Sequence, residues 1–389
     1  MKTKTYNLIK NFKQPGCIVL GISNIAGLSI VRSLGVKKIP VIGIANSRLE
    51  IGVFSKYCLS VEIFSKEEEL LYLLEEIGKT SVYKNVIFCE HDIFLLFVEK
   101  NREHLEKYFH LLLPEKMSLN GLMNKKDMVK LAQASGVGVP LTFFSDEVLL
   151  DEIKNKMIYP SIVKPLYSQY NQSTKCDVIN DEEELNGSIK KDRYRTGYVI
   201  QEVIEGKEDK IWVCGGYCNS NTEFLGLFTG HKYRQLPKLF GSTTLGVSQR
   251  NTAVMEMAMT FLKHIGYQGC FSFEAKQRGD EYKFIETNFR ICFWNEMARS
   301  SGINLPYIAY CDVVGLPCEG VIKQKDGIIW ISILDDFITC FKHYSRDSKF
   351  IFIDWIKNVF GANSYAVFEL TDIPPFLVKM LKILLKIRD

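Results

Sequence analysis

Apolar and polar residues alternate in two segments of residues 269–290 that are separated by a turn, and the rest of the chain can be interpreted around this region. In CFSFEAK the phenylalanines point to one side, and Ser272, Glu274 and Lys276 point to the other, which is the period of a β-strand. The segment QRGDE supplies a turn with Gly279-Asp280 at its tip, and YKFIETNFR then alternates again. The pattern predicts a β-hairpin, followed by a helix before Pro306.

The polar face of this hairpin carries a specific set of side chains. Glu274 lies on its first strand, and Glu286, Asn288 and Arg290 share one face of the second. Carboxylate and amide oxygens suit a hard divalent cation such as magnesium, and an arginine beside them suits a phosphate or an acyl phosphate. The alternative interpretation is the solvated outer face of an ordinary hairpin.

Residues 16–64 show the order strand, helix, strand and short strand. CIVLG and IPVIGIA are continuous apolar runs, and IAGLSIVRSLG between them has helical spacing and ends at Gly35. This βαβ order predicts a parallel sheet. The turn GISNIAG is not the G-x-G-x-x-G of dinucleotide sites, and no acidic residue closes the second strand. A scaffold domain whose strand ends touch a substrate is therefore favoured over a dinucleotide site.

The next buried strand, NVIFCEHD, ends at His91 and Asp92. Open α/β sheets bind ligands at the carboxyl ends of their strands, so this pair is a candidate for the substrate site. A lone His-Asp pair is more often structural, and that alternative stays open.

Further along the chain, single cations occupy positions that suggest anionic partners. Lys125 lies in the first turn of a helix capped by Asn124, where the helix dipole disfavours a cation. Lys164 ends an apolar strand before a proline and a polar loop. In HKYRQLPKLFG, Lys232 and Arg234 alternate onto one face. Lys125 could instead be simply solvated, and the polar loop after Lys164 could be an ordinary surface hairpin loop.

Composition limits the classes of function. The chain has 389 residues, of which 47% are hydrophobic and 24% charged, with a net charge of +4, as in an ordinary globular protein of two or three domains. No Lys/Arg run interleaves with aromatic residues, so no nucleic-acid partner is expected. The 11 cysteines form no C-x-x-C pair, and no apolar run reaches the length of a membrane span. We expect a cytoplasmic protein with reduced thiols.

Taken together, these segments resemble the ATP-grasp superfamily of ADP-forming carboxylate–amine ligases over residues 16–320. The resemblance is carried by NK at Lys125, VKP at Lys164, QEVIEGKE, FSFEAK and FIETNFR, in that order. KYRQLPKLFG resembles the K-x-R-Q-x-P-x-x-F-G segment of the branch that contains D-aspartate ligases and carbamoyl-phosphate-synthase-like proteins.

The resemblance implies an α/β and α+β protein with the ATP-grasp fold. A pre-ATP-grasp parallel-sheet domain would span residues 1–115, and the ATP-grasp domain residues 116–320. Within the latter, a lid subdomain would cover about 125–196 and a C-terminal lobe about 197–320. Residues 321–389 would form a C-terminal extension.

The resemblance also implies how ATP would be held. Lys125 and Lys164 would contact the α- and β-phosphates. The backbone of Glu202 and Val203 would meet adenine, and Glu208 would accept from the ribose hydroxyls. The loop between Lys164 and Lys175 normally carries glycines in this superfamily, whereas PLYSQYNQST has none.

The remaining implied roles belong to the reaction itself. Two magnesium ions would be held by Glu274, Glu286 and Asn288. Lys232 and Arg290 would stabilise the transferred phosphoryl group, and Arg234 would meet the substrate carboxylate. The enzyme would phosphorylate a carboxylate and couple it to an amine, with ADP and phosphate released.

Partners and alternatives follow from the same resemblance. One substrate could be lipid-linked or a nucleotide sugar, since GIIWISILDDF and the final segment resemble ATP-grasp proteins of cell-surface polysaccharide and peptidoglycan biosynthesis. The basic helix PPFLVKMLKILLKIRD, with Lys379, Lys382 and Lys386 along one side, either lies on an anionic membrane or packs on the ligase body. A homodimer is compatible with the sequence. Two alternatives remain: a nucleotide-binding regulatory protein without turnover, and a carbamoyl-phosphate-type kinase acting on bicarbonate.

Overall fold

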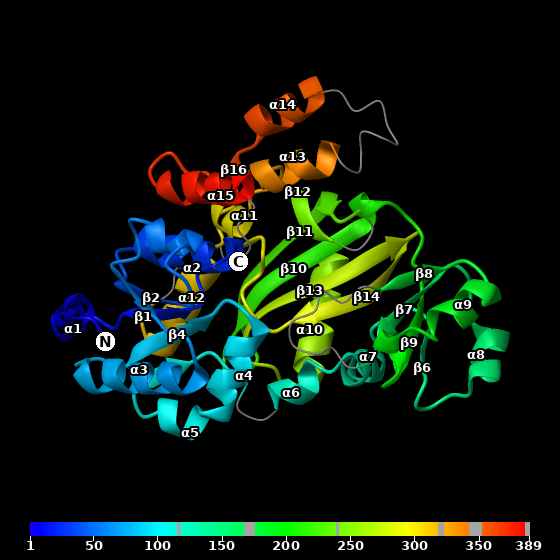
Figure 1. Cartoon of the computed structure of the whole chain (residues 1–389), viewed down its shortest axis with the longest axis horizontal. Coiled ribbons are helices and arrows are strands. Elements are labelled where there is room, and N and C mark those ends of the chain that lie inside the picture. The colour runs from blue at the N-terminus through cyan, green and yellow to red at the C-terminus, as the bar shows by residue number, and fades with distance from the viewer. Residues whose placement is uncertain (115–117, 167–175, 239–240, 318–322, 342–351, 386–389) are drawn as a thin grey trace.

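Three β-sheets follow one another through the molecule (Figure 1). The structure is a computed structural model that describes residues 1–114, 118–166, 176–238, 241–317, 323–341 and 352–385. The first sheet belongs to an N-terminal domain, the second to a small domain at the opposite end of the molecule, and the third lies between them. This mixture of parallel and antiparallel sheets agrees with the expected α/β and α+β class.

The N-terminal sheet is fully parallel, in the order β3-β2-β1-β4-β5. Its strands β1, β2 and β4 are buried at every position because helices cover the sheet, which explains their continuous apolar runs. The predicted βαβ unit is therefore confirmed. The elements are β1 Cys17–Leu20, β2 Val41–Ala45, β3 Ser60–Ile63, β4 Asn85–Cys89, β5 Phe109–Leu111, α1 Thr3–Lys10, α2 Ile25–Gly35, α3 Glu67–Thr80, α4 Asp92–Lys100, α5 Arg102–Leu105 and the 3₁₀-helix η1 Ile51–Phe54.

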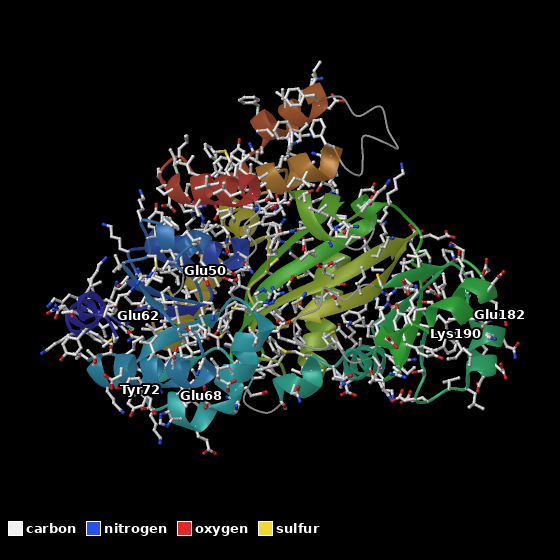
Figure 2. All side chains as sticks on the ribbon, viewed as in Figure 1. Glu50, Glu62, Glu68, Tyr72, Glu182 and Lys190 are labelled. Atoms are coloured by element: carbon white, nitrogen blue, oxygen red, sulfur yellow. The ribbon has the colours of Figure 1, made fainter. Side chains whose placement is uncertain are left out.

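The acidic helix α3 shows how its sequence pattern becomes a surface. Leu70, Leu73, Leu74 and Ile77 are buried at helical spacing, and the acidic residues of the first turn face solvent. Figure 2 labels Glu68 and Tyr72 on this solvated side. The charge run therefore forms an outer face.

The small domain is a four-stranded antiparallel sheet in the order β6-β9-β7-β8. Helix α9 buries Leu185 and leaves its glutamates in solvent, and Glu182 and Lys190 lie on the outer side of the domain (Figure 2). The elements are β6 Thr142–Phe144, β7 Ser161–Pro165, β8 Asp177–Ile179, β9 Tyr198–Glu202, α6 Leu119–Leu122, α7 Lys125–Ala134, α8 Leu150–Lys156, α9 Glu182–Ser188 and η2 Asp192–Tyr194.

The third sheet has seven strands in the order β14-β13-β10-β11-β12-β15-β16. The predicted hairpin is β13–β14, and its apolar face packs on helix α10, where the rings of Phe261 and Phe273 lie 6.2 Å apart. The elements are β10 Ile211–Cys218, β11 Phe224–Leu236, β12 Ser242–Ser248, β13 Gly269–Arg278, β14 Glu281–Asn288, β15 Ile329–Ile331, β16 Ser364–Tyr365, α10 Thr252–His264, α11 Asn295–Ser300, α12 Leu305–Val314 and η3 Glu208–Lys210.

The C-terminal extension is built into the rest of the protein. Its strands β15 and β16 extend the seven-stranded sheet, and its helices α13 Ile333–Thr339, α14 Phe352–Gly361 and α15 Pro374–Leu384 lie along one edge of the molecule (Figure 1). Asp372, just before α15, is buried and accepts hydrogen bonds from Arg32 Nε at 2.9 Å and Ser55 Oγ at 2.7 Å. This network fixes the extension to α2 and η1.

Helix α15 packs against the rest of the protein, and its contact with an anionic membrane stays a prediction. Pro375 and Lys382 are buried, and Lys379 forms an ion pair with Asp335 of α13. The lysine side of the helix therefore faces the protein, whereas Lys386 lies outside the described residues. Among the helices that the structure describes, none is both long and apolar enough to cross a membrane.

Candidate functional site

Two glutamates face each other across the β13–β14 hairpin. Glu274 and Glu286 are partners in the strand register, so both side chains leave the same face of the sheet. Burial raises the pKa of Glu274, and the like charge of Glu286 adds to this effect, whereas Lys232 opposes it. Asn288 lies beside Glu286 and donates from Nδ2 to Oε1 at 3.3 Å. The hairpin thus brings together the three side chains proposed as metal ligands.

This donor set fits magnesium in composition. No group of three or more His, Cys, Asp or Glu side chains within the described ranges is arranged to hold a metal ion. The hairpin offers two carboxylates and one amide, so further ligands would have to come from water or phosphate oxygens. Magnesium commonly binds in this way, through one or two carboxylates together with substrate phosphates.

Two lysines converge on the same cleft from a helix and a neighbouring strand. Lys125 is the first residue of α7, whose N-cap Asn124 accepts from Lys126 N at 2.9 Å, and Lys164 lies near the end of β7. Both ammonium groups line a cleft together with Glu286 and Asn288. Burial lowers the pKa of both lysines; Lys164 lowers that of Lys125 further, and Glu286 opposes the shift at both. Two cations that are crowded and partly desolvated create a site suited to a polyanion.

The N-terminal domain reaches this cleft through the end of β4. Asp92 lines the cleft, and its Oδ1 accepts from Arg290 Nε at 3.0 Å. Burial lowers the pKa of the adjacent His91, and the Arg290 charge adds to that shift. The structure therefore brings the His91-Asp92 pair, which follows strand β4, next to the arginine of the hairpin.

Lys232 and Arg234 have different partners, although the sequence placed them on one face. The pairing of β11 with β12 shifts register between these residues, which breaks the simple alternation. Lys232 Nζ lies 3.0 Å from Oε2 of Glu274, one of the proposed metal ligands. Arg234 instead pairs with buried Asp336 of α13, at 2.9 Å from Nε to Oδ1 and 2.7 Å from Nη2 to Oδ2. The role of Arg234 at a substrate carboxylate stays a prediction.

The connector after β9 was expected to hold adenine through its backbone. The N–H groups of Glu202 and Val203 already donate to Leu141 O at 2.9 Å and to Pro160 O at 3.0 Å. Adenine would therefore have to use carbonyl groups here or the residues that follow. Glu208 is buried, and its Oε1 has no hydrogen-bond partner in the part of the chain that the structure describes. An oxygen without a partner at this position fits the proposed contact with ribose hydroxyls.

Some residues that shape the site were not singled out from the sequence. Lys276 Nζ donates to Ile204 O at 2.7 Å, and Arg278 Nη1 lies 2.8 Å from Glu202 Oε1, so β13 holds the connector at two points. Both residues continue the alternation that identified Glu274, and that signal was present in the sequence. Asp336 had no such signal. The glycine-free loop falls in residues 167–175, which lie outside the described residues.

Comparisons with known proteins give a consistent result at the level of fold. No protein-family model matches the sequence, and no curated protein matches it. Among solved structures, the ADP complex of an N5-carboxyaminoimidazole ribonucleotide synthetase superposes with a TM-score of 0.64 at 12% identity, covering 86% of each chain. An L-amino acid ligase from Bacillus licheniformis gives 0.58 at 16% identity, covering 78% of this chain and 75% of the other.

A biotin carboxylase from Campylobacter jejuni is similar as well. It gives a TM-score of 0.63 at 16% identity and covers 78% of this chain and 72% of the other. These structural neighbours are ATP-grasp ligases. At such low identity the likeness concerns the fold, and it extends over most of both chains. The chain therefore has the ATP-grasp fold, with an N-terminal parallel-sheet domain and a cleft between its small domain and its central sheet.

Proposed function

We propose that this protein is an ATP-dependent ligase that phosphorylates a carboxylate and couples it to an amine, releasing ADP and phosphate. One observation carries the proposal: Lys125, Lys164, Glu286 and Asn288 line a single cleft in an ATP-grasp fold. The lysines supply charge for a polyphosphate, and the hairpin supplies oxygen ligands for magnesium. The structural neighbours include an N5-carboxyaminoimidazole ribonucleotide synthetase, an L-amino acid ligase and a biotin carboxylase, which supports the general chemistry.

The residues divide between holding and transferring the phosphoryl group. Lys125 and Lys164 would orient the phosphates of ATP, and bound magnesium would offset charge on the transferred group. Lys232 and Arg290 lie next to Glu274 and Asp92, so both cations are positioned by carboxylates at the two sides of the hairpin. They would stabilise the oxygens of the phosphoryl group and of the acyl phosphate. The amine then attacks the activated carbonyl, and phosphate leaves.

The acceptor substrates would enter from the N-terminal domain. His91 and Asp92 follow strand β4 at the start of α4, at the edge where α/β sheets bind ligands, and Asp92 lines the cleft. We propose that the product is an amide on a cell-wall precursor or on a nucleotide-linked sugar. The support for this finer statement is the sequence resemblance of GIIWISILDDF described above.

A second candidate takes bicarbonate as the acid. The biotin carboxylase domain of a 2-oxoglutarate carboxylase from Hydrogenobacter thermophilus was solved with MgADP and bicarbonate; it matches with a TM-score of 0.62 at 14% identity, covering 82% of this chain and 74% of the other. In that case ADP release would need bicarbonate and no organic acid.

The experiment is an ADP-release screen over a matrix of organic acids, bicarbonate and amines, followed by isotope labelling of the active acid. Heavy oxygen in the carboxylate should appear in inorganic phosphate, only with ATP and magnesium present. AMP as the nucleotide product, or unlabelled phosphate, would rule out the mechanism. ATP binding without turnover over the whole matrix would favour the regulatory alternative.

A further inference from the structure

The C-terminal extension carries a concentration of exposed apolar side chains. Of the 27 large apolar residues that are exposed in the described part of the chain, 13 lie within residues 337–385. Exposed apolar side chains gathered in one region indicate a surface that contacts another protein or a membrane. We call it the outer apolar surface, and its main members are Ile353, Phe360, Leu377, Leu381, Leu384 and Leu385.

Helix α15 is oriented with its charges inward and its leucines outward. Lys382 is only 8% exposed, and Lys379 Nζ lies 2.5 Å from Asp335 Oδ2. By contrast, Leu381 is 53% and Leu384 70% exposed. A helix that needed only the protein core would bury its leucines and leave its lysines in water. This inverted arrangement neutralises the charges internally and presents an uncharged outer face.

Helix α14 adds to the same edge of the molecule (Figure 1). None of its ten residues is buried, and Phe360 is 83% exposed. The ring of Trp355 lies 5.2 Å from that of Phe337 in α13, and the ring of Phe352 lies 6.2 Å from that of Phe341, just after α13. The helix is thus fixed in place while much of its apolar surface stays uncovered.

We propose that α14 and α15 dock this protein onto a lipid bilayer, lying in the plane between headgroups and acyl chains. The outer apolar surface is formed by helices at the periphery of the molecule, and a fluid bilayer can accommodate such a shape without a matching partner (Figure 1). Its members are aliphatic and aromatic side chains, as in short helices that lie on membranes. The lysines of α15 are turned inward, so they need not be desolvated on insertion.

Charges at the rim fit an anionic headgroup layer. Lys357 of α14 is exposed, and Lys56 is exposed beside the start of α15, where its backbone N–H donates to Asp372 Oδ1 at 2.9 Å. Asp354 opposes Lys357 at 3.6 Å, so the electrostatic contribution is small. Insertion of apolar side chains is therefore the main source of affinity, and salt should weaken binding only slightly.

The test is flotation of the full chain with vesicles of phosphatidylcholine, with and without phosphatidylglycerol. The wild type should float with both, and Leu381→Ser/Leu384→Ser, with or without Phe360→Ser, should lower partitioning about tenfold or more. Val82→Ser and Leu149→Ser are matched controls, because these side chains are 75% and 80% exposed in other domains. They should leave partitioning unchanged. Circular dichroism confirms that each variant is folded.

Three outcomes would overturn the proposal. The first is a wild type that does not float with either vesicle. The second is a dimer in light scattering that the Leu381/Leu384 variant dissociates without any loss of flotation, which would assign the surface to a second copy of the chain. The third is flotation that disappears at about 0.5 M salt, which would mean electrostatic attachment instead of apolar insertion.

Discussion

The cleft and the C-terminal extension differ in whether their buried charges have partners of opposite charge within the protein. In the extension, Asp372 pairs with Arg32 and Asp336 with Arg234, and both oxygens of each carboxylate accept hydrogen bonds. In the cleft, burial lowers the pKa of both Lys125 and Lys164, and the nearby Lys164 charge lowers that of Lys125 further. Within the described residues, neither of these lysines forms an ion pair.

The difference separates structure from function. A buried charge whose partners lie inside the protein holds the fold together, and nothing further is needed to satisfy it. Like charges that remain crowded raise the free energy of the empty protein, and a ligand of opposite charge removes that cost. Each prediction below tests one side of this comparison.

The largest effect should come from breaking the paired side. Asp372→Asn leaves Arg32 buried with much of its compensating charge removed, which should lower the free energy of unfolding by about 3–5 kcal/mol. Denaturant unfolding measures it. Asp354→Asn, at an exposed ion pair, is the control and should change little. Equal stability of the two variants would contradict the role assigned to Asp372.

On the cleft side, Glu286→Gln should lower ADP formation about 100- to 1,000-fold, since it removes an anionic ligand from the proposed metal site. The fold should survive, because Glu286 is exposed. Glu281→Gln, on the same strand and away from the cleft, is the matched control. Full activity of Glu286→Gln at ordinary magnesium concentrations would contradict the assignment of Glu286 as a magnesium ligand.

Glu90 is a buried acidic residue that is only partly satisfied, so it lies between the two cases. Its Oε1 accepts a hydrogen bond from Ser23 Oγ at 2.7 Å, whereas its Oε2 has no hydrogen-bond partner among the described residues. Burial, and to a lesser degree Glu50, raises the pKa of Glu90 from 4.5 to about 7. Between these values the unfolded chain has released a proton that the folded protein keeps. Stability should therefore fall as pH rises through this window, by about 3 kcal/mol for this group.

Glu90→Gln should remove that dependence, measured by unfolding at a series of pH values. Glu182→Gln, on the outer side of the small domain (Figure 2), should keep the wild-type slope. An unchanged slope in Glu90→Gln would show that Glu90 is already ionised in the folded protein.

The smallest effect is expected for Lys164→Met, which should weaken ATP binding but stabilise the protein without ATP. Lys164→Met should weaken ATP binding about ten- to a hundredfold, the value of a lost charge-assisted hydrogen bond. The same change should raise the melting temperature without ATP, because burial disfavours this charge. Calorimetric titration and thermal melts measure the two, with Lys190→Met as the exposed control. A lower melting temperature without ATP would assign Lys164 to the fold instead.

The sequence predicted the hairpin and its polar face because alternation with a period of two records which side of a strand meets the core. The same logic brought Glu274 and Glu286 together, as register partners. Alternation failed at Arg234, since a register shift in β11 is invisible in the residue pattern. It also could not indicate Asp336, because a partner 102 residues away depends on tertiary packing.

Helical spacing has a related limit. In α15 it placed the lysines along one side of the helix, without indicating whether that side meets the protein or a membrane. The structure turns Lys379 and Lys382 inward, because Asp335 and the nearby Glu50 provide opposite charges. Spacing defines the two sides of a helix, and only the surrounding protein decides which of them is buried.

The bond between Arg32 and Asp372 joins residues 340 positions apart, and this has a consequence for synthesis. Domains generally form in the order in which they leave the ribosome. The N-terminal domain is made first, yet the cation inside its helix α2 meets its carboxylate only after nearly the whole chain has emerged. The N-terminal domain can therefore complete its folding only after the C-terminal segment has been synthesised. A chain whose synthesis is interrupted would keep Arg32 without its carboxylate partner, and quality-control proteases could recognise this incompletely folded state.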